Sequence, residues 1–274
     1  MKKILFVSDS AHFPEGAFRF AEQLRGEETI VLKGIFFNEL EGSWMAPDLY
    51  DRLNRETGEP KVKQTISVVE SSNRFIEKCR AAGIRYETQH YFEGWDRNFF
   101  SRESRFADLA ILSEDLFCPD LVEGQPNLFM QQLLQDAECP VIALPESFQS
   151  IDHIVVAYDG NKESVFALKQ FTNLLPGYQD LPIEFVYLRE EESEDLPDGQ
   201  LLQAYTNAHY DAGNAIRLHF LPGHSFRHWL REKKNTLVVA GSFSRSQTSM
   251  LFKRSFAADL IKHHQVPVFI AHNA

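Results

Sequence analysis

The sequence predicts an α/β protein made of two tandem, doubly wound domains, each with a five-stranded parallel sheet. The first observation is an internal repeat: a short apolar run ending in aspartate occurs at residues 4–9 and again at residues 154–159. The second is a matching repeat at the end of each copy, at residues 139–144 and 266–271. The third is the length of 274 residues, which suits two domains of about 100–150 residues each.

Apolar strands alternate with helical segments in both copies, which is typical of a parallel sheet covered on both faces. In the first copy we expect further strands near residues 29–37, 85–92 and 107–112, and helices near 14–24 and 63–82. In the second copy we expect further strands near residues 183–188, 216–221 and 235–240, and helices near 161–175 and 199–212. The joint falls near residues 145–151, so the predicted domains are residues 1–147 and 151–274.

Charge and composition exclude several classes of function. The formal net charge of −11 argues against nucleic-acid binding, which needs clustered Lys and Arg. The apolar run after Lys2 and Lys3 stops too soon for a signal peptide, and no stretch is long enough to span a membrane. Three widely spaced cysteines without a CxxC pair indicate a reducing cytoplasm and no structural zinc.

The loop that follows residues 236–241 carries the motif that points to a family. Gly241, Ser244, Arg254 and Ser255 occupy the positions of a G-x-x-G, nine residues, G-[ST] pattern. This loop resembles the ATP-binding loop of universal stress proteins, although two of its three glycines are replaced. Val266-Pro267-Val268 also resembles the closing C-P-V run of that family. The resemblance covers the second copy, and the first copy matches in layout, in Asp9 and in Cys139-Pro140-Val141.

The resemblance implies a site for ATP or another adenine nucleotide in the second copy only. Backbone N–H groups of a strand-to-helix loop can hold phosphate, and glycine allows the backbone to approach it closely. Asp159, at the end of the opening strand, can accept from the adenine amino group or the ribose. The predicted nucleotide-binding residues are Asp159, Leu188, Gly241, Ser244, Arg254 and Ser255.

Two substitutions leave the outcome at this loop open. Ser244 is tolerated if its φ is negative and is costly if the backbone there is left-handed. Arg254 can either fill the phosphate pocket or donate to phosphate directly. The second copy therefore holds either a competent nucleotide site or a vestigial one.

The corresponding loop of the first copy carries negative charges that should repel phosphate. Ser113 stands where the second copy has Gly241, and residues 114–127 contain four carboxylates. No Lys or Arg occurs from residue 106 to residue 145, whereas the second loop carries Arg245, Lys253 and Arg254. Negative charge without a compensating cation should prevent a triphosphate from binding here.

Other candidate sites are weak. His224 and His228 share the i, i+4 spacing of a helical metal pair, but no third ligand is identifiable, so we expect no metal site. No nucleophile elbow, P-loop or dinucleotide motif is present, which argues against an enzyme beyond at most weak ATP hydrolysis.

The resemblance also implies an architecture and a biological role. The expected strand order is 3-2-1-4-5, with the two closing strands paired antiparallel, so that the chain forms an internal pseudo-dimer able to pair again into a homodimer. The expected function is a stress-response module that binds or senses a nucleotide. The alternative is an interaction or scaffold protein in which both pockets are degenerate.

Overall fold

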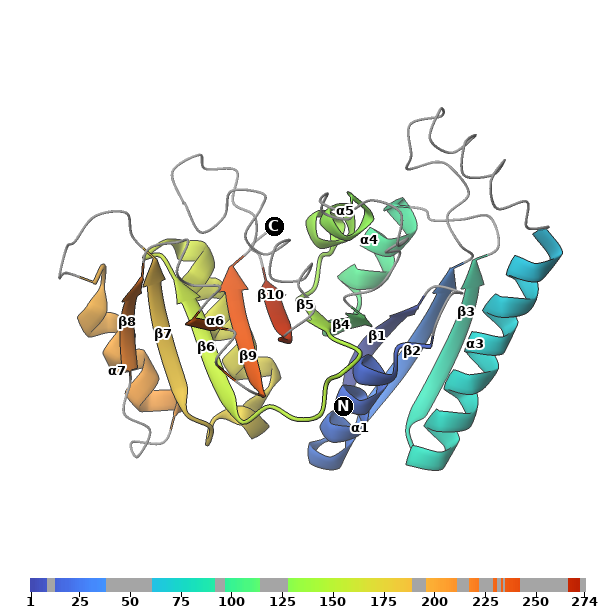
Figure 1. Cartoon of the computed structure of the whole chain (residues 1–274), viewed down its shortest axis with the longest axis horizontal. Helices are drawn as coiled ribbons and strands as arrows, with labels where there is room; N and C mark the ends of the chain where they lie inside the picture. Colours follow the sequence, from blue (N-terminus) through green and yellow to red (C-terminus); the bar gives the residue numbers. More distant parts are fainter. Residues whose placement is uncertain are drawn as a thin grey trace. The chain divides into compact units, whose positions relative to one another are not determined.

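A computed structural model shows two compact α/β units, residues Met1–Cys139 and Pro140–Ala274. The structure describes residues 1–8, 13–37, 61–91, 97–113, 128–188, 196–210, 217–221, 229–230, 233, 235–241 and 266–271. The strands of each unit are mainly parallel, with helices packed against them (Figure 1). The predicted fold class is confirmed.

The first unit contains four described strands in the order β3-β2-β1-β4. Its described elements are β1 (Lys2–Ser8), α1 (Glu15–Glu27), β2 (Ile30–Phe37), α3 (Lys61–Ala82), β3 (Arg85–Tyr91), α4 (Arg97–Arg105), β4 (Leu109–Ser113) and α5 (Leu128–Asp136). All of these strand pairs are parallel. β1 is buried from Ile4 to Ser8 and β4 along its whole length, as expected for strands with helices on both faces.

The second unit contains six described strands in the order β5-β10-β9-β6-β7-β8. Its described elements are β5 (Val141–Leu144), β6 (His153–Tyr158), α6 (Lys162–Leu174), a 3₁₀ turn (Pro176–Tyr178), β7 (Ile183–Leu188), α7 (Gly199–His209), β8 (Arg217–Leu221), β9 (Thr236–Gly241) and β10 (Val268–Ala271). Counted from β6, the order is third, second, first, fourth, fifth, as predicted.

The strand β5 joins the second unit through an antiparallel pairing with β10. Phe269 lies opposite Ile142, and Val268 lies opposite Ala143. The expected antiparallel pairing of the two closing strands is therefore confirmed. This spatial division differs from the sequence repeat, in which residues 141–144 close the first copy.

The core of the first unit is an aromatic cluster. Phe6, Phe18, Phe36 and Phe75 are almost completely buried. The ring centroids of Phe6 and Phe75 are 5.2 Å apart, and those of Phe36 and Phe75 are 5.5 Å apart. Phe18 of α1 and Phe75 of α3 also meet edge to face, which places these two helices on the same face of the sheet. Much of the high phenylalanine content is thus core packing.

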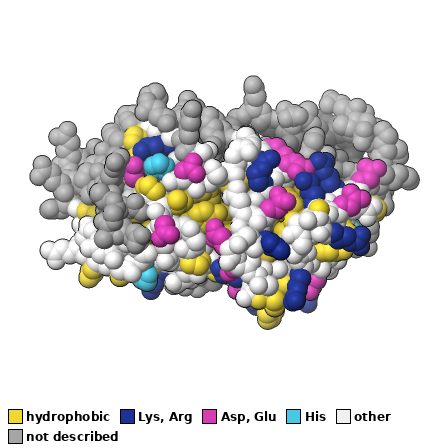
Figure 2. Space-filling model, turned by 90° about the horizontal axis from the view of Figure 1, so that it is seen from below, with side chains coloured by type: hydrophobic (Ala, Val, Ile, Leu, Met, Phe, Trp, Pro, Cys, Tyr) yellow, Lys and Arg dark blue, Asp and Glu magenta, His cyan; other side chains and the backbone are white. Residues whose placement is uncertain are grey.

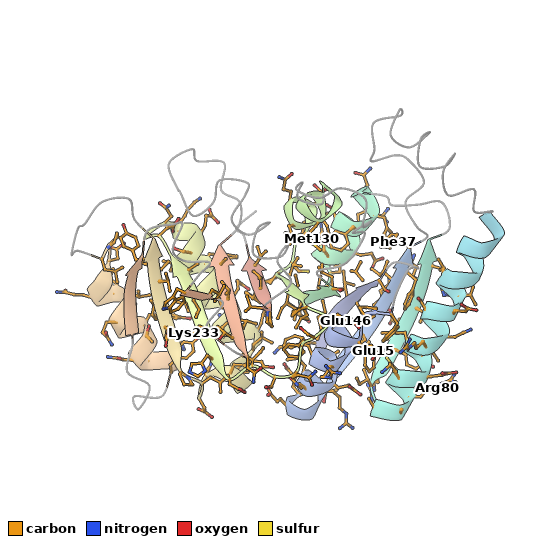
Figure 3. The ribbon with its side chains drawn as sticks, viewed as in Figure 1. Glu15, Phe37, Arg80, Met130, Glu146 and Lys233 are labelled. Atoms are coloured by element: carbon orange, nitrogen blue, oxygen red, sulfur yellow. The ribbon has the colours of Figure 1, made fainter. Side chains whose placement is uncertain are left out.

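Charged side chains of both signs are interspersed on the outside of the first unit (Figure 2). Two ion pairs are typical: Lys2 with Glu28, and Arg105 with Glu138 through two hydrogen bonds of 2.6 and 2.7 Å. Glu15 of α1, labelled in Figure 3, pairs with Arg74 and Lys78 of α3. Such pairs at the surface, partly or fully exposed, add little stability, but they neutralise the charges of one another.

The two buried thiols should be unreactive in the folded chain. Burial raises the pKa of both Cys79 and Cys139 from an ordinary value of 9.0 to about 12, so neither forms a thiolate near neutral pH. We expect an alkylating reagent to label these cysteines only after denaturation, as measured by peptide mass spectrometry. The unfolded thiols ionise near pH 9, so the stability of the first unit should fall as the pH rises from about 9 to 12. Rapid native labelling of Cys79 would contradict this prediction.

Candidate functional site

The candidate site lies where β6 and β9 end side by side in the second unit. These neighbouring strands are parallel, with Ala157 opposite Ala240. Asp159 follows the last residue of β6, and Gly241 is the last residue of β9. From this point the chain continues from β6 toward β7 and from β9 toward β10, on opposite sides. In open α/β sheets, ligands bind at such a switch in strand order.

The carboxylate of Asp159 is held in a turn that leads into α6. One oxygen accepts from the backbone N–H of Asn161 at 3.0 Å, and the other accepts from the side-chain Nδ2 of Asn161 at 2.9 Å. The negative charge therefore lies just before the N-terminus of α6, where the helix dipole stabilises it. Asp159 thus has a structural role that needs no ligand.

Gly241 is in close contact with the first turn of α6. A Cβ atom added at Gly241 would lie 2.7 Å from the carbonyl carbon of Glu163, 2.8 Å from its oxygen and 2.9 Å from the nitrogen of Ser164. All three are backbone atoms, which cannot rotate away. The sequence motif assigns this glycine to ligand binding, whereas the structure shows that helix–strand packing alone requires it. The small, buried side chains of Ser164 and Ala167 on α6 were the sequence signal for this close approach.

A second segment is fixed to the end of β6. The hydroxyl of the buried Tyr158 donates to the backbone carbonyl of Pro197 at 2.9 Å. Gly160 has a φ of +77°, and a Cβ added there would lie 2.6 Å from the Cβ of Pro197. The residues on both sides of Asp159 therefore contact Pro197, which directly precedes Asp198, the N-cap residue of α7. Sequence reasoning missed this contact because Pro197 follows an acidic segment that has the composition of a solvated loop.

The remaining predicted residues are placed only in part. Leu188 ends β7, next to β6, with Tyr187 opposite Tyr158 in the parallel register. Ser244, Arg254 and Ser255 lie outside the described residues, and so does Asp9 of the first copy. The structure therefore brings Asp159, Leu188 and Gly241 to one end of the sheet.

The corresponding position in the first unit is built differently. Ser113 ends β4 and is buried, and the parallel register places Val7 of β1 opposite Leu112 of β4. A side chain is thus accommodated where the second unit requires glycine. The acidic loop of residues 114–127 is outside the described residues, so the repulsion of phosphate by this loop stays a prediction.

The described part of the chain contains no group of three His, Cys, Asp or Glu residues arranged to hold a metal ion. His224 and His228 fall outside that part. Among the helices described, none has the length and apolar character needed to cross a membrane.

Comparison with known proteins agrees with this architecture. No family model matches the chain. Universal stress protein Slr1230 of Synechocystis sp. is 19% identical over 285 residues, an alignment that covers 98% of this chain and 99% of the relative. A universal stress protein from Archaeoglobus fulgidus has the same fold, with a TM-score of 0.69 and 14% identity over 100% of this chain and 97% of the other. The chain is thus similar to universal stress proteins in sequence along its whole length, and it has their fold.

A second solved structure has the same fold. A putative universal stress protein from Pseudomonas aeruginosa aligns with a TM-score of 0.58 and 12% identity, over 99% of this chain and 93% of the other. Both structural relatives are covered almost completely, as expected if the two-unit organisation is common to them.

Proposed function

We propose that this chain is a universal stress protein, acts in a stress response and binds an adenine nucleotide in its second unit. The observation that carries the proposal is the position of Asp159 and Gly241 at the switch in strand order between β6 and β9. In the sequence, the loop after Gly241 bears Arg245, Lys253 and Arg254, which supply positive charge for phosphate. Under this proposal Leu188, Ser244 and Ser255 complete the nucleotide contacts.

A second candidate function is supported by the contacts of the same two residues. Asp159 is engaged by Asn161, and Gly241 is required by the backbone of α6. Both residues are therefore explained without a ligand. This favours the alternative of an interaction or scaffold protein that keeps the fold and binds no nucleotide.

Calorimetric titration with ATP, ADP and AMP separates these two functions, and the chain offers a matched pair of variants. Asp159 directly follows β6, and Asp152 directly precedes it at the opposite end of the same strand. Each carboxylate accepts from an asparagine side chain, Asn161 at 2.9 Å and Asn235 at 2.6 Å. We expect Asp159→Ala to weaken nucleotide binding about tenfold or more, because a charge-assisted hydrogen bond to the ligand is lost.

The variant Asp152→Ala should lower stability by a similar amount while leaving nucleotide affinity unchanged. An equal loss of affinity in both variants would mean that Asp159 acts only through the fold. Absence of binding by the unmodified chain would favour the scaffold function.

A further inference from the structure

The contact between β6 and the start of α7 brings a second carboxylate to the candidate site. Asp198 directly follows Pro197, which is fixed by the hydroxyl of Tyr158 and by the close approach of Gly160. Asp198 is exposed, and its backbone is left-handed, with a φ of 53°. Its carbonyl accepts a hydrogen bond from the backbone N–H of Leu202 in the first turn of α7. Its position is therefore set by both the strand and the helix.

The charges of Asp198 and Asp159 act on the same atom. After burial, these two carboxylates are the main causes that raise the pKa of the Tyr158 hydroxyl, Asp198 before Asp159. The Tyr158 hydroxyl bonds to the carbonyl of Pro197, the residue before Asp198, and Asp159 directly follows Tyr158, so both residues lie near the side chain of Tyr158. The contact with Pro197 places Asp198 there independently of any titration.

The first turn of α6 adds a third carboxylate to this end of the sheet. Glu163 has only 13% of its side chain exposed, and the ammonium of Lys162 lies 3.5 Å from one of its oxygens. With Asp159 and Asp198, the described residues around the end of β6 thus include three carboxylates and one ammonium. Among the described residues, the charges at this end of the sheet are therefore mainly negative.

We propose that Asp198 is a specificity-determining residue of the second unit, which selects nucleotides whose ribose hydroxyls carry no phosphate. This inference rests on the proposed function and refines it. A carboxylate accepts hydrogen bonds from ribose hydroxyls and repels a phosphate in the same place, which is how acidic residues of other nucleotide-binding α/β sheets discriminate. Asp198 and Asp159 together would make that discrimination stronger than one carboxylate does.

The test compares the affinities of the full chain for AMP and for adenosine 3′,5′-bisphosphate, measured by calorimetry at one ionic strength. We expect the unmodified chain to bind AMP about tenfold more tightly than the bisphosphate. The variant Asp198→Asn should lower this ratio about fivefold, because it removes the charge while asparagine still tolerates the left-handed backbone. Asp180→Asn is the control, since Asp180 is also exposed but lies in the turn before β7, at the other end of the sheet.

The outcomes distinguish this inference from the proposed function. The role of Asp198 is supported if the ratio of AMP affinity to bisphosphate affinity falls in Asp198→Asn and is unchanged in Asp180→Asn. If the ratio of AMP affinity to bisphosphate affinity changes no more in Asp198→Asn than in Asp180→Asn, the role of Asp198 is overturned, and nucleotide binding is left intact. If the unmodified chain binds neither compound, the proposal of nucleotide binding is wrong, and the proposed selectivity is wrong as well.

Discussion

Replacing Lys233 by methionine is expected to lower the free energy of unfolding of the second unit by about 3–5 kcal/mol. Lys233, labelled in Figure 3, donates to both carboxylate oxygens of Glu184, at 2.9 and 3.1 Å. Glu184 lies in β7 and is 3% exposed, so methionine would leave its charge buried without this partner. Lys233 also lies over the ring of Trp229, with its ammonium 4.6 Å from the ring centroid. Urea denaturation followed by circular dichroism and tryptophan fluorescence measures the loss.

Two controls separate the buried charge from a general effect of losing a lysine. Lys162→Met removes an ammonium that is 81% exposed and 3.5 Å from Glu163, so it should change stability little. The double variant Glu184→Leu, Lys233→Met removes both charges and should recover most of the stability. Equal losses of stability in Lys233→Met and Lys162→Met would contradict the explanation by a buried, uncompensated charge.

The substitution Gly241→Ala should destabilise the second unit by about 1–3 kcal/mol, whether or not a nucleotide is present. The new methyl group would lie under 3.0 Å from three backbone atoms of Glu163 and Ser164, so α6 must move away from β9. α6 also packs on β10, where Phe171 meets Phe269 at 5.4 Å. Thermal unfolding without ligand measures the effect.

Gly199→Ala is the matched control for Gly241→Ala in the same unit. A Cβ at Gly199 would be no closer than 3.4 Å to Leu196, an ordinary contact, and the position begins α7. We expect this variant to be as stable as the unmodified chain or slightly more stable. If Gly241→Ala were fully stable and lost only nucleotide binding, the glycine would serve the ligand and not the packing.

The fold could be predicted from the sequence because its strands are nearly continuous apolar runs. The predicted strand at residues 183–188 coincides with β7, and the predicted helix at 161–175 differs from α6 by one residue at each end. Helix α4 was not predicted. Its sequence RNFFSRESR has only two apolar residues, Phe99 and Phe100, and gives no helical period.

The candidate site was less predictable because its residues have roles that no motif encodes. Asp159 was expected to face a ligand, but its hydrogen bonds to Asn161 follow from the turn into α6. The proximity of Pro197 to Gly160 depends on how the segment before α7 returns to β6, which is a tertiary contact. The sequence pattern therefore assigns Asp159 and Gly241 to one end of the sheet, and packing decides which residues surround them.

The pairing of β5 with β10 has a consequence for synthesis of the chain. β10 follows β5 only after almost the whole second unit, so during synthesis the edge of β5 that pairs with β10 stays without that partner until this unit has emerged. Pairings between segments far apart in sequence are slow to form, and an unpaired strand edge can meanwhile accept a strand from another chain. We therefore expect the nascent chain to be most prone to strand exchange and aggregation between the emergence of β5 and that of β10.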